Sequence, residues 1–274
     1  MVEETNRTIV SLPRNMWIFL LVTFAWTWTF GFLAKALSED GLMSGSVGIL
    51  ILIGSFGPLF GALISAYMEH GLQGIQRLIR KVGPIKSNWK NFLIACYLFV
   101  PAIALAAIVY GRENLNSTLS EVALLFFIPL VALFSVMTGP LGEEFGWRGI
   151  LLPYFLERQS SLRASLFVGL IWAIWHLPLW TFSEFRSNEK LIIFVPLYVL
   201  SIVAVSFIMT WIYLRSHGSI AVAIIAHSAF NCSLLPLESL SQKGVLEGQF
   251  IFPFVLATVL TSIFAAKQIK SKNS

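Results

Sequence analysis

The sequence predicts an all-α fold, namely a polytopic membrane bundle of about eight transmembrane helices. Hydrophobic residues make up 57% of the 274 residues and charged residues only 12%, whereas soluble domains carry about 25% charged residues. Uncharged apolar runs of about 20 residues, the length that crosses the hydrocarbon core of a bilayer, recur along the chain. These runs are apolar almost throughout, which excludes the alternating segments of a β-barrel. With only two cysteines, a disulfide-stapled secreted domain is excluded as well.

Eight apolar runs follow one another, and each is expected to be a membrane-spanning helix. They cover residues 16–36, 47–68, 91–110, 122–141, 164–180, 191–214, 219–237 and 249–266. The fifth run is short and contains Pro178, which is expected to kink its helix. No hydrophilic stretch is long enough for an extramembrane domain. We therefore expect a single integral membrane domain over residues 1–274.

The basic residues lie mostly on one side of the predicted bundle. With eight spans, both termini share a side with the connections after spans two, four and six, and most of the 19 Lys and Arg residues fall there. The positive-inside rule then places both termini in the cytoplasm. These residues flank the predicted spans and do not form a continuous basic surface. The net charge of +5 therefore reflects the orientation of the chain in the membrane, and no nucleic-acid partner is expected. Residues 70–90 combine a helical period with a cationic face, either as an ordinary connection or as a site for anionic lipid headgroups.

Three polar clusters lie in or beside predicted spans, where ionisable side chains are costly and mark functional sites. They occur near the end of the fourth span, within the fifth and within the seventh. The members are Glu143, Glu144 and Arg148 in the first, Trp172 and His176 in the second, and His227 and Asn231 in the third.

Helix geometry predicts different roles for the two adjacent acids. Consecutive residues are rotated by about 100° around a helix, so Glu143 and Glu144 point in different directions. Glu144 stands four residues before Arg148, the favourable order for an ion pair along a helix. Glu143 is then left to face a cavity as a general base. The alternative is one salt-bridge network that holds both acids at the membrane edge.

The two histidines are informative only in combination with the acid. Singly, His176 or the His227–Asn231 pair is typical of hydrogen bonding between membrane helices. Together with Glu143 they provide a carboxylate, two imidazoles and an amide on three helices. Such a set can activate water and stabilise a tetrahedral intermediate. Because Glu143 must reach the depth of both histidines in the bilayer, residues 147–157 are expected to continue as an embedded or amphipathic helix. The cavity is expected to open toward the cytoplasm, so that water can reach it.

The motifs Glu143-Glu144-x-x-x-Arg148, Trp172-x-x-x-His176 and His227-x-x-x-Asn231 resemble those of the CAAX prenyl protease type II and bacteriocin-processing (CPBP, or Abi) family of intramembrane endopeptidases. The resemblance covers about residues 122–236, although family members usually carry Phe where this chain has Trp172. It implies that Glu143, helped by His176, activates a water, and that His227 and Asn231 stabilise the oxyanion. Glu144, Arg148 and Trp172 would support the site.

The resemblance also implies a substrate class and leaves the cofactor open. The expected partners are the lipid bilayer and a membrane-anchored peptide or protein, prenylated CAAX-like substrates included, in a bacterial cell membrane. No cofactor is favoured, because the chain lacks an H-E-x-x-H pair; zinc held by Glu143, His176 and His227 is the alternative. Two other functions stay open, a proton-coupled transporter with these residues as its relay and a non-catalytic bacteriocin-immunity protein.

Overall fold

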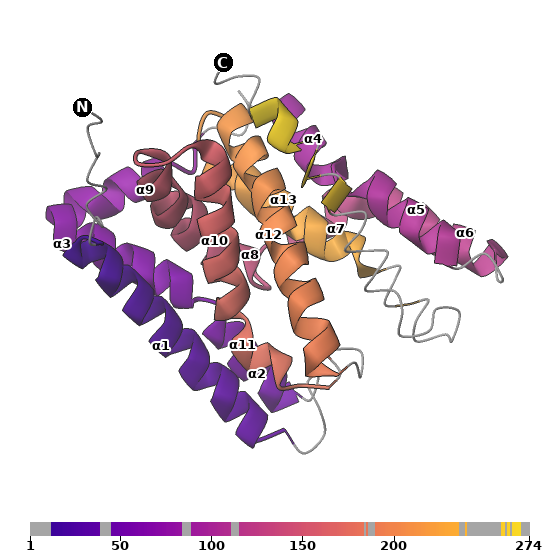
Figure 1. Cartoon of the computed structure of the whole chain (residues 1–274), viewed down its shortest axis with the longest axis horizontal. Helices are drawn as coiled ribbons and strands as arrows, with labels where there is room; N and C mark the ends of the chain where they lie inside the picture. The colour runs from indigo at the N-terminus through magenta and orange to yellow at the C-terminus, as the bar shows by residue number, and fades with distance from the viewer. Residues whose placement is uncertain are drawn as a thin grey trace, which may run out of the picture.

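All regular elements in the described part of the chain are helices, as the computed structural model in Figure 1 shows. The model describes residues 12–38, 45–83, 89–110, 115–183, 185, 190–235, 239, 259–260, 262–263 and 265–269. The elements are α1 (Arg14–Ala36), α2 (Gly45–Gly54), α3 (Gly57–Arg80), α4 (Trp89–Tyr97), α5 (Val100–Tyr110), α6 (Leu115–Ala123), η3 (Leu124–Phe127), α7 (Ile128–Ser135), α8 (Pro140–Gly146), η4 (Trp147–Leu151), α9 (Leu152–Leu156), α10 (Ser161–Trp175), α11 (Leu177–Trp180), α12 (Leu191–Arg215) and α13 (Ile220–Ser233).

The lengths and compositions of these helices confirm a polytopic membrane bundle. Four helical segments of the described chain are long and apolar enough to cross a bilayer, at Arg14–Ala36, Gly45–Arg80, Asn116–Leu133 and Leu191–Arg215. Two shorter apolar helices, Ser161–Trp175 and Ile220–Ser233, pack among them. Large apolar side chains such as Ile192 and Phe126 remain about four-fifths exposed. That exposure suits a surface solvated by lipid.

Several predicted spans differ in detail from the observed helices. The predicted span 91–110 consists of α4 and α5, which are separated at Leu98 and Phe99. The predicted span 164–180 breaks at His176, between α10 and α11. Pro178 explains this break, since it lacks an N–H and its ring excludes the carbonyl four residues earlier. The predicted span 249–266 lies mostly outside the described residues.

The first and third helices pack closely through small residues. Gly57 and Gly61 of α3 face Thr23 and Thr27 of α1, and a Cβ added at either glycine would lie 2.7 Å from a backbone carbonyl oxygen of α1. Small residues four apart let membrane helices approach in this way. The hydroxyl of Thr27 also donates to the carbonyl of Gly54, which ties α1 to α2.

Gly57→Ala is therefore expected to lower the free energy of unfolding by about 1–3 kcal/mol, the usual cost of overpacking. Its Cβ would lie 2.2 Å from the Thr27 hydroxyl oxygen. Gly48→Ala in α2 is the matched control, because nothing lies within 4 Å of the added methyl group. Thermal unfolding in detergent measures both. Equal midpoints for the two variants would contradict the close α1–α3 contact.

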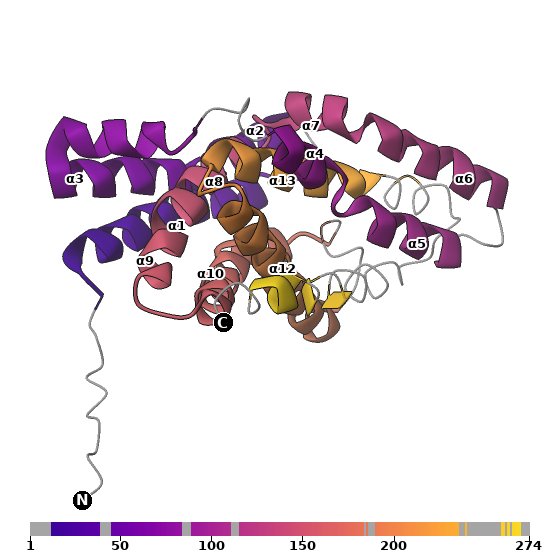
Figure 2. The same ribbon diagram turned by 90° about the horizontal axis from the view of Figure 1, so that it is seen from above.

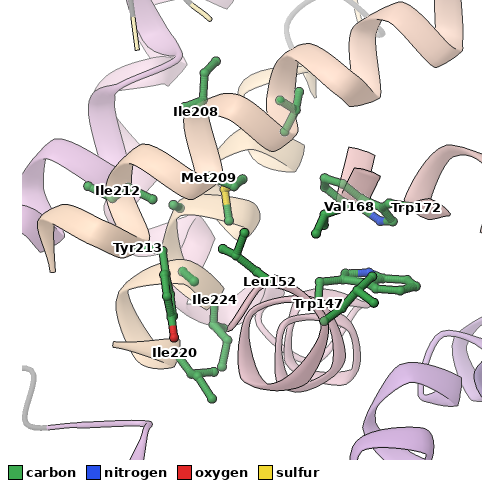
Figure 3. Close-up of a cluster of buried hydrophobic side chains, with 14 of the residues drawn as sticks. Trp147, Leu152, Val168, Trp172, Ile208, Met209, Ile212, Tyr213, Ile220 and Ile224 are labelled. Carbon is green, nitrogen blue, oxygen red and sulfur yellow. The ribbon is translucent and has the colours of Figure 1, made fainter. Parts of the chain in front are cut away.

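The main core lies between η4, α9, α10, α12 and α13 (Figure 3). Trp147 and Trp172 contribute its two largest fully buried apolar side chains. A Cβ added at Gly169 of α10 would lie 2.8 Å from the Cα of Val203 in α12, which shows that the two helix backbones are in close contact. Ser206 reinforces that contact by donating to the carbonyl of Ser165 at 2.8 Å.

The third helix folds back on itself, as the view from above shows (Figure 2). The reversal occurs at His70 and Gly71, and Gly71 has a φ of 59°, which favours glycine. Gly74 then lies so close to Ala66 that a Cβ would meet its carbonyl oxygen. Of the amphipathic segment predicted at 70–90, residues 72–80 are helical, whereas 84–88 lie outside the described residues.

Candidate active site

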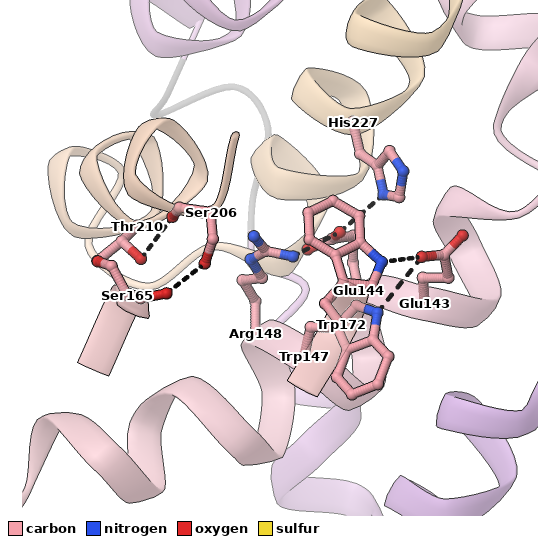
Figure 4. A network of polar contacts seen from close by, with 9 residues as sticks. All are labelled: Glu143, Glu144, Trp147, Arg148, Ser165, Trp172, Ser206, Thr210 and His227. Atoms are coloured by element: carbon pink, nitrogen blue, oxygen red, sulfur yellow. Dashed lines mark hydrogen bonds and ion pairs between the residues drawn. The ribbon is translucent and has the colours of Figure 1, made fainter. Parts of the chain in front are cut away.

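The short helix α8 positions Glu143. It follows Gly139, whose φ of 137° favours glycine, and begins with Pro140. The Glu143 side chain is buried, and its Oε2 accepts a hydrogen bond from Trp172 Nε1 at 2.7 Å and one from Trp147 Nε1 at 3.3 Å (Figure 4). Its Oε1 lies on the opposite side, 3.1 Å from where a Cβ of Gly139 would be. Two neutral N–H groups thus donate to Oε2, and neither of them donates to Oε1.

Glu144 forms a separate buried ion-pair cluster. Its Oε1 accepts from Arg148 Nη1 at 3.0 Å and from His227 Nδ1 at 2.8 Å. Glu144 and Arg148 are fully buried, and His227 is 3% exposed. The predicted Glu144–Arg148 pair is confirmed, and the single network holding both acids is wrong, because Glu143 bonds to indoles instead. The hydrogen bond between Glu144 and His227 was not predicted, because the two residues stand 83 positions apart and no spacing along one helix relates them.

Trp172 connects the three predicted clusters. Its ring lies 5.1 Å from the ring of His227 and 6.0 Å from that of His176, centre to centre. Its carbonyl oxygen is 2.9 Å from His176 Nδ1. Because a carbonyl can only accept, this nitrogen carries the proton, and Nε2 of a neutral His176 ring keeps a lone pair. The side chain predicted to support the site is therefore in contact with Glu143 and both histidines.

His176 is held at the break between α10 and α11 by aromatic neighbours. The ring of Trp175 lies edge-on at 4.6 Å, and the ring of Tyr198 from α12 lies 5.5 Å away. Trp175 is fixed in turn, since its Nε1 donates to the Thr27 hydroxyl at 2.8 Å. Tyr198 was missed because a tyrosine within a long apolar helix gives no sequence signal of its own.

Glu143 and His176 line one small cavity of about 120 Å³. The other walls come from α1, α2, α11 and the residues that join them, with small or apolar side chains such as Gly31, Ile51 and Leu179. Trp147, which donates to Glu143, packs edge-on against Phe19, and both rings are fully buried. The opening of the cavity toward the cytoplasm remains a prediction.

Asn231 is the predicted site residue least tied to this centre. It stands one helical turn beyond His227 on α13 and is partly exposed. Within the described residues its side chain makes no hydrogen bond, whereas His227 is held by Glu144. Asn231 is thus free to bond to a bound molecule. The roles of Asn231 and of the other site residues remain predictions.

Comparisons with known proteins agree with the motifs. Residues 124–233 match the family model described as Type II CAAX prenyl endopeptidase Rce1-like. The CAAX prenyl protease 2 of Methanococcus maripaludis is 25% identical to this chain, in an alignment of 267 positions that covers 92% of this chain and 96% of that protein. Both comparisons support the resemblance to the CPBP family that the three motifs indicated.

The residues of this centre do not form a recognisable metal site. Among the described residues, no group of three or more His, Cys, Asp and Glu is placed to hold a metal ion. Glu143, His176 and His227, the predicted alternative ligands, therefore do not fit zinc in this arrangement. The Oε2 atom of Glu143 receives two indole N–H groups, so only its Oε1 atom is free of them.

Trp172→Phe is expected to lower kcat by less than about tenfold. The change removes one donor to Glu143, while the N–H of Trp147 remains. The net contribution of one hydrogen bond is about 0.5–1.5 kcal/mol, and about 1.4 kcal/mol corresponds to a tenfold change in rate. Phenylalanine is also the usual residue of CPBP proteins at this position. Steady-state kinetics of Trp172→Phe and of the double variant with Trp147→Phe check this. A loss from Trp172→Phe alone as large as that from removing Glu143 would contradict it.

Proposed function

We propose that the protein hydrolyses a peptide bond of a membrane-anchored, CAAX-type prenylated polypeptide, with water activated by Glu143 and His176. The observation that carries this proposal is the division between the two acids. Glu143 and His176 share a cavity, while Glu144 is occupied by Arg148 and His227. A centre with an uncommitted carboxylate and an imidazole lone pair suits general-base attack by water.

In the proposed reaction, the free Oε1 of Glu143 accepts a proton from a water as its oxygen attacks the carbonyl carbon of the scissile bond. Nε2 of His176 accepts the hydrogen bond of the second water proton. The carbonyl oxygen becomes an oxyanion, which an imidazolium at His227 and the amide of Asn231 stabilise as donors. The carbon–nitrogen bond then breaks, and the proton on Glu143 moves to the leaving nitrogen. The new carboxyl group then gives its remaining proton to the amine, so the products are a carboxylate and a protonated amine.

Glu144 would act through His227 in this scheme. Because it binds Nδ1, it orients the ring so that Nε2 faces away from the ion pair. Arg148 keeps that carboxylate neutralised in a space from which water is excluded. We propose these two as positioning residues.

The substrate class is supported by the name of the Methanococcus maripaludis relative, a CAAX prenyl protease. A farnesylated peptide ending in a CAAX sequence, in liposomes with the full chain, tests it. The expected result is release of the C-terminal tripeptide, seen by mass spectrometry, at a rate well above that for the same peptide without the prenyl group. Equal rates for both peptides would contradict prenyl recognition. The cytoplasmic placement of both termini is proposed from the distribution of basic residues, and the bacterial membrane from the compact chain without long loops.

We also propose that the reaction needs no metal. Purified protein is expected to contain less than one zinc per ten chains by elemental analysis, and a chelator is expected to leave its activity unchanged. The reason is the lack of a suitable ligand group among the described residues. Stoichiometric zinc that disappears in His227→Ala would overturn this proposal.

A further inference from the structure

A second and larger cavity lies at the basic end of the bundle, where α1 begins and α3 folds back. Its volume is about 500 Å³, and its walls come from the first turn of α1, from both halves of α3, and from η4, α9 and the turn after α9. Buried Ser65, Gly74 and Gly149 line its inner walls. The proposed hydrolysis makes no use of this cavity.

Positive charge in the cavity exceeds the negative charge and is less well compensated. Arg77, Lys81 and Arg158 line it together with two acids, Glu69 and Glu157. Both acids are engaged, since Glu69 accepts from Asn15 at 3.1 Å and Glu157 accepts from Arg158 at 2.9 Å.

The other two cations lack an acidic partner within hydrogen-bonding distance in the described part of the chain. Arg77 makes no ion pair there, and Lys81 donates from Nζ to the carbonyl of Gly149 at 2.9 Å. Partial burial lowers the pKa of the Lys81 ammonium, although Glu157 and Glu69 oppose this shift. Arg77 and Lys81 stand four residues apart, so both charges lie on one face of the folded-back helix.

An apolar surface lies on the opposite face of the same helix. Leu72 is 70% exposed and Ile79 is 53% exposed, and their spacing of seven residues places them on one face. Tyr67 and Met68, just before the reversal, are also about half exposed. A helix with an exposed apolar face opposite a cationic face is typical of a segment that lies in the membrane interface.

We propose that this cavity binds the phosphate of an anionic phospholipid through Arg77 and Lys81, at the headgroup depth that the exposed apolar face gives the helix. The phosphate is an acceptor-only anion that matches two cations without an acidic partner within hydrogen-bonding distance. This interfacial position places the cavity among lipid headgroups, which favours a lipid over a free phosphate. Lys81 also connects the site to the rest of the fold, because its carbonyl accepts from the backbone N–H of Ile220 at the start of α13.

The test is native mass spectrometry of the purified full chain in detergent with added phosphatidylglycerol or phosphatidylcholine. Each basic residue near a membrane surface contributes roughly fivefold to anionic lipid binding. We expect at least about fivefold preference for phosphatidylglycerol, and a loss of about threefold or more of that preference in Arg77→Gln and in Lys81→Gln. Arg80→Gln is the matched control, since Arg80 is exposed on the same helix and does not line the cavity; its preference should change by less than about twofold.

Three results would overturn the proposal. One is equal retention of the two lipids by the unaltered protein. Another is an equal loss in all three variants, which would indicate diffuse attraction to the basic surface. The third is displacement of phosphatidylglycerol by millimolar inorganic phosphate, which would identify a free anion as the ligand. If Lys81→Gln fails to fold, the lipid preference of Arg77→Gln alone tests the proposal. Arg77 makes no ion pair with the described residues, so its substitution should leave the fold intact.

Discussion

Glu143→Gln is expected to lower kcat/KM by about 10²- to 10⁴-fold, the usual contribution of a general base. Glutamine has the size of glutamate, and its carbonyl oxygen can still accept from Trp172 and Trp147, so the thermal midpoint should stay nearly unchanged. The amide cannot take a proton from water, which removes the proposed base. Kinetics on a reconstituted peptide substrate together with thermal unfolding measure both effects.

The matched control for Glu143→Gln is Glu157→Gln. The side chain of Glu157 is 70% exposed and is paired with the neighbouring Arg158, so the same chemical change should leave kcat/KM within about twofold, as is usual for an exposed ion pair. Activity of Glu143→Gln close to that of the unaltered protein would remove Glu143 from the reaction.

Glu144→Gln is expected to act first on stability. The change leaves the guanidinium of Arg148 charged in a fully buried position, and breaking a buried ion pair in this way costs about 3–5 kcal/mol. Activity should fall as well, because His227 loses the carboxylate that holds Nδ1. Denaturation in detergent and kinetics at a temperature below the lowered midpoint separate the two effects.

A double variant distinguishes the ion pair from the orienting role. Glu144→Gln combined with Arg148→Met removes both charges, so most of the lost stability should return. Activity should stay low, since the bond to His227 remains altered. Additive losses of stability would contradict the buried pair, and recovered activity would contradict the positioning of His227 by Glu144.

The parts of this centre that depend on local geometry were predictable from sequence. Four-residue spacing predicted the Glu144–Arg148 pair, and Pro178 predicted the break that follows His176. The helical continuation after Glu143 is confirmed in η4 and α9. A π-helical turn at Trp147–Leu151 was not predicted, because its pattern of apolar residues does not differ from that of an α-helix.

The parts that depend on packing between distant segments were not predictable. The bond from Glu144 to His227 joins α8 to α13, and the ring of Tyr198 reaches His176 from α12. The two indole donors on Glu143 come from η4 and α10. Each of these contacts depends on how the helices are arranged in the bundle, which spacing along one helix does not specify.

Hydrolysis in ¹⁸O-labelled water under single-turnover conditions tests the central claim most directly. The proposed attack by water predicts one ¹⁸O atom in the new carboxylate of the N-terminal product. Added hydroxylamine should trap no hydroxamate, since no side chain bonds to the substrate. Trapping of a hydroxamate would indicate an acyl-enzyme formed by a serine or cysteine nucleophile. That result would contradict direct attack by a water that Glu143 and His176 activate.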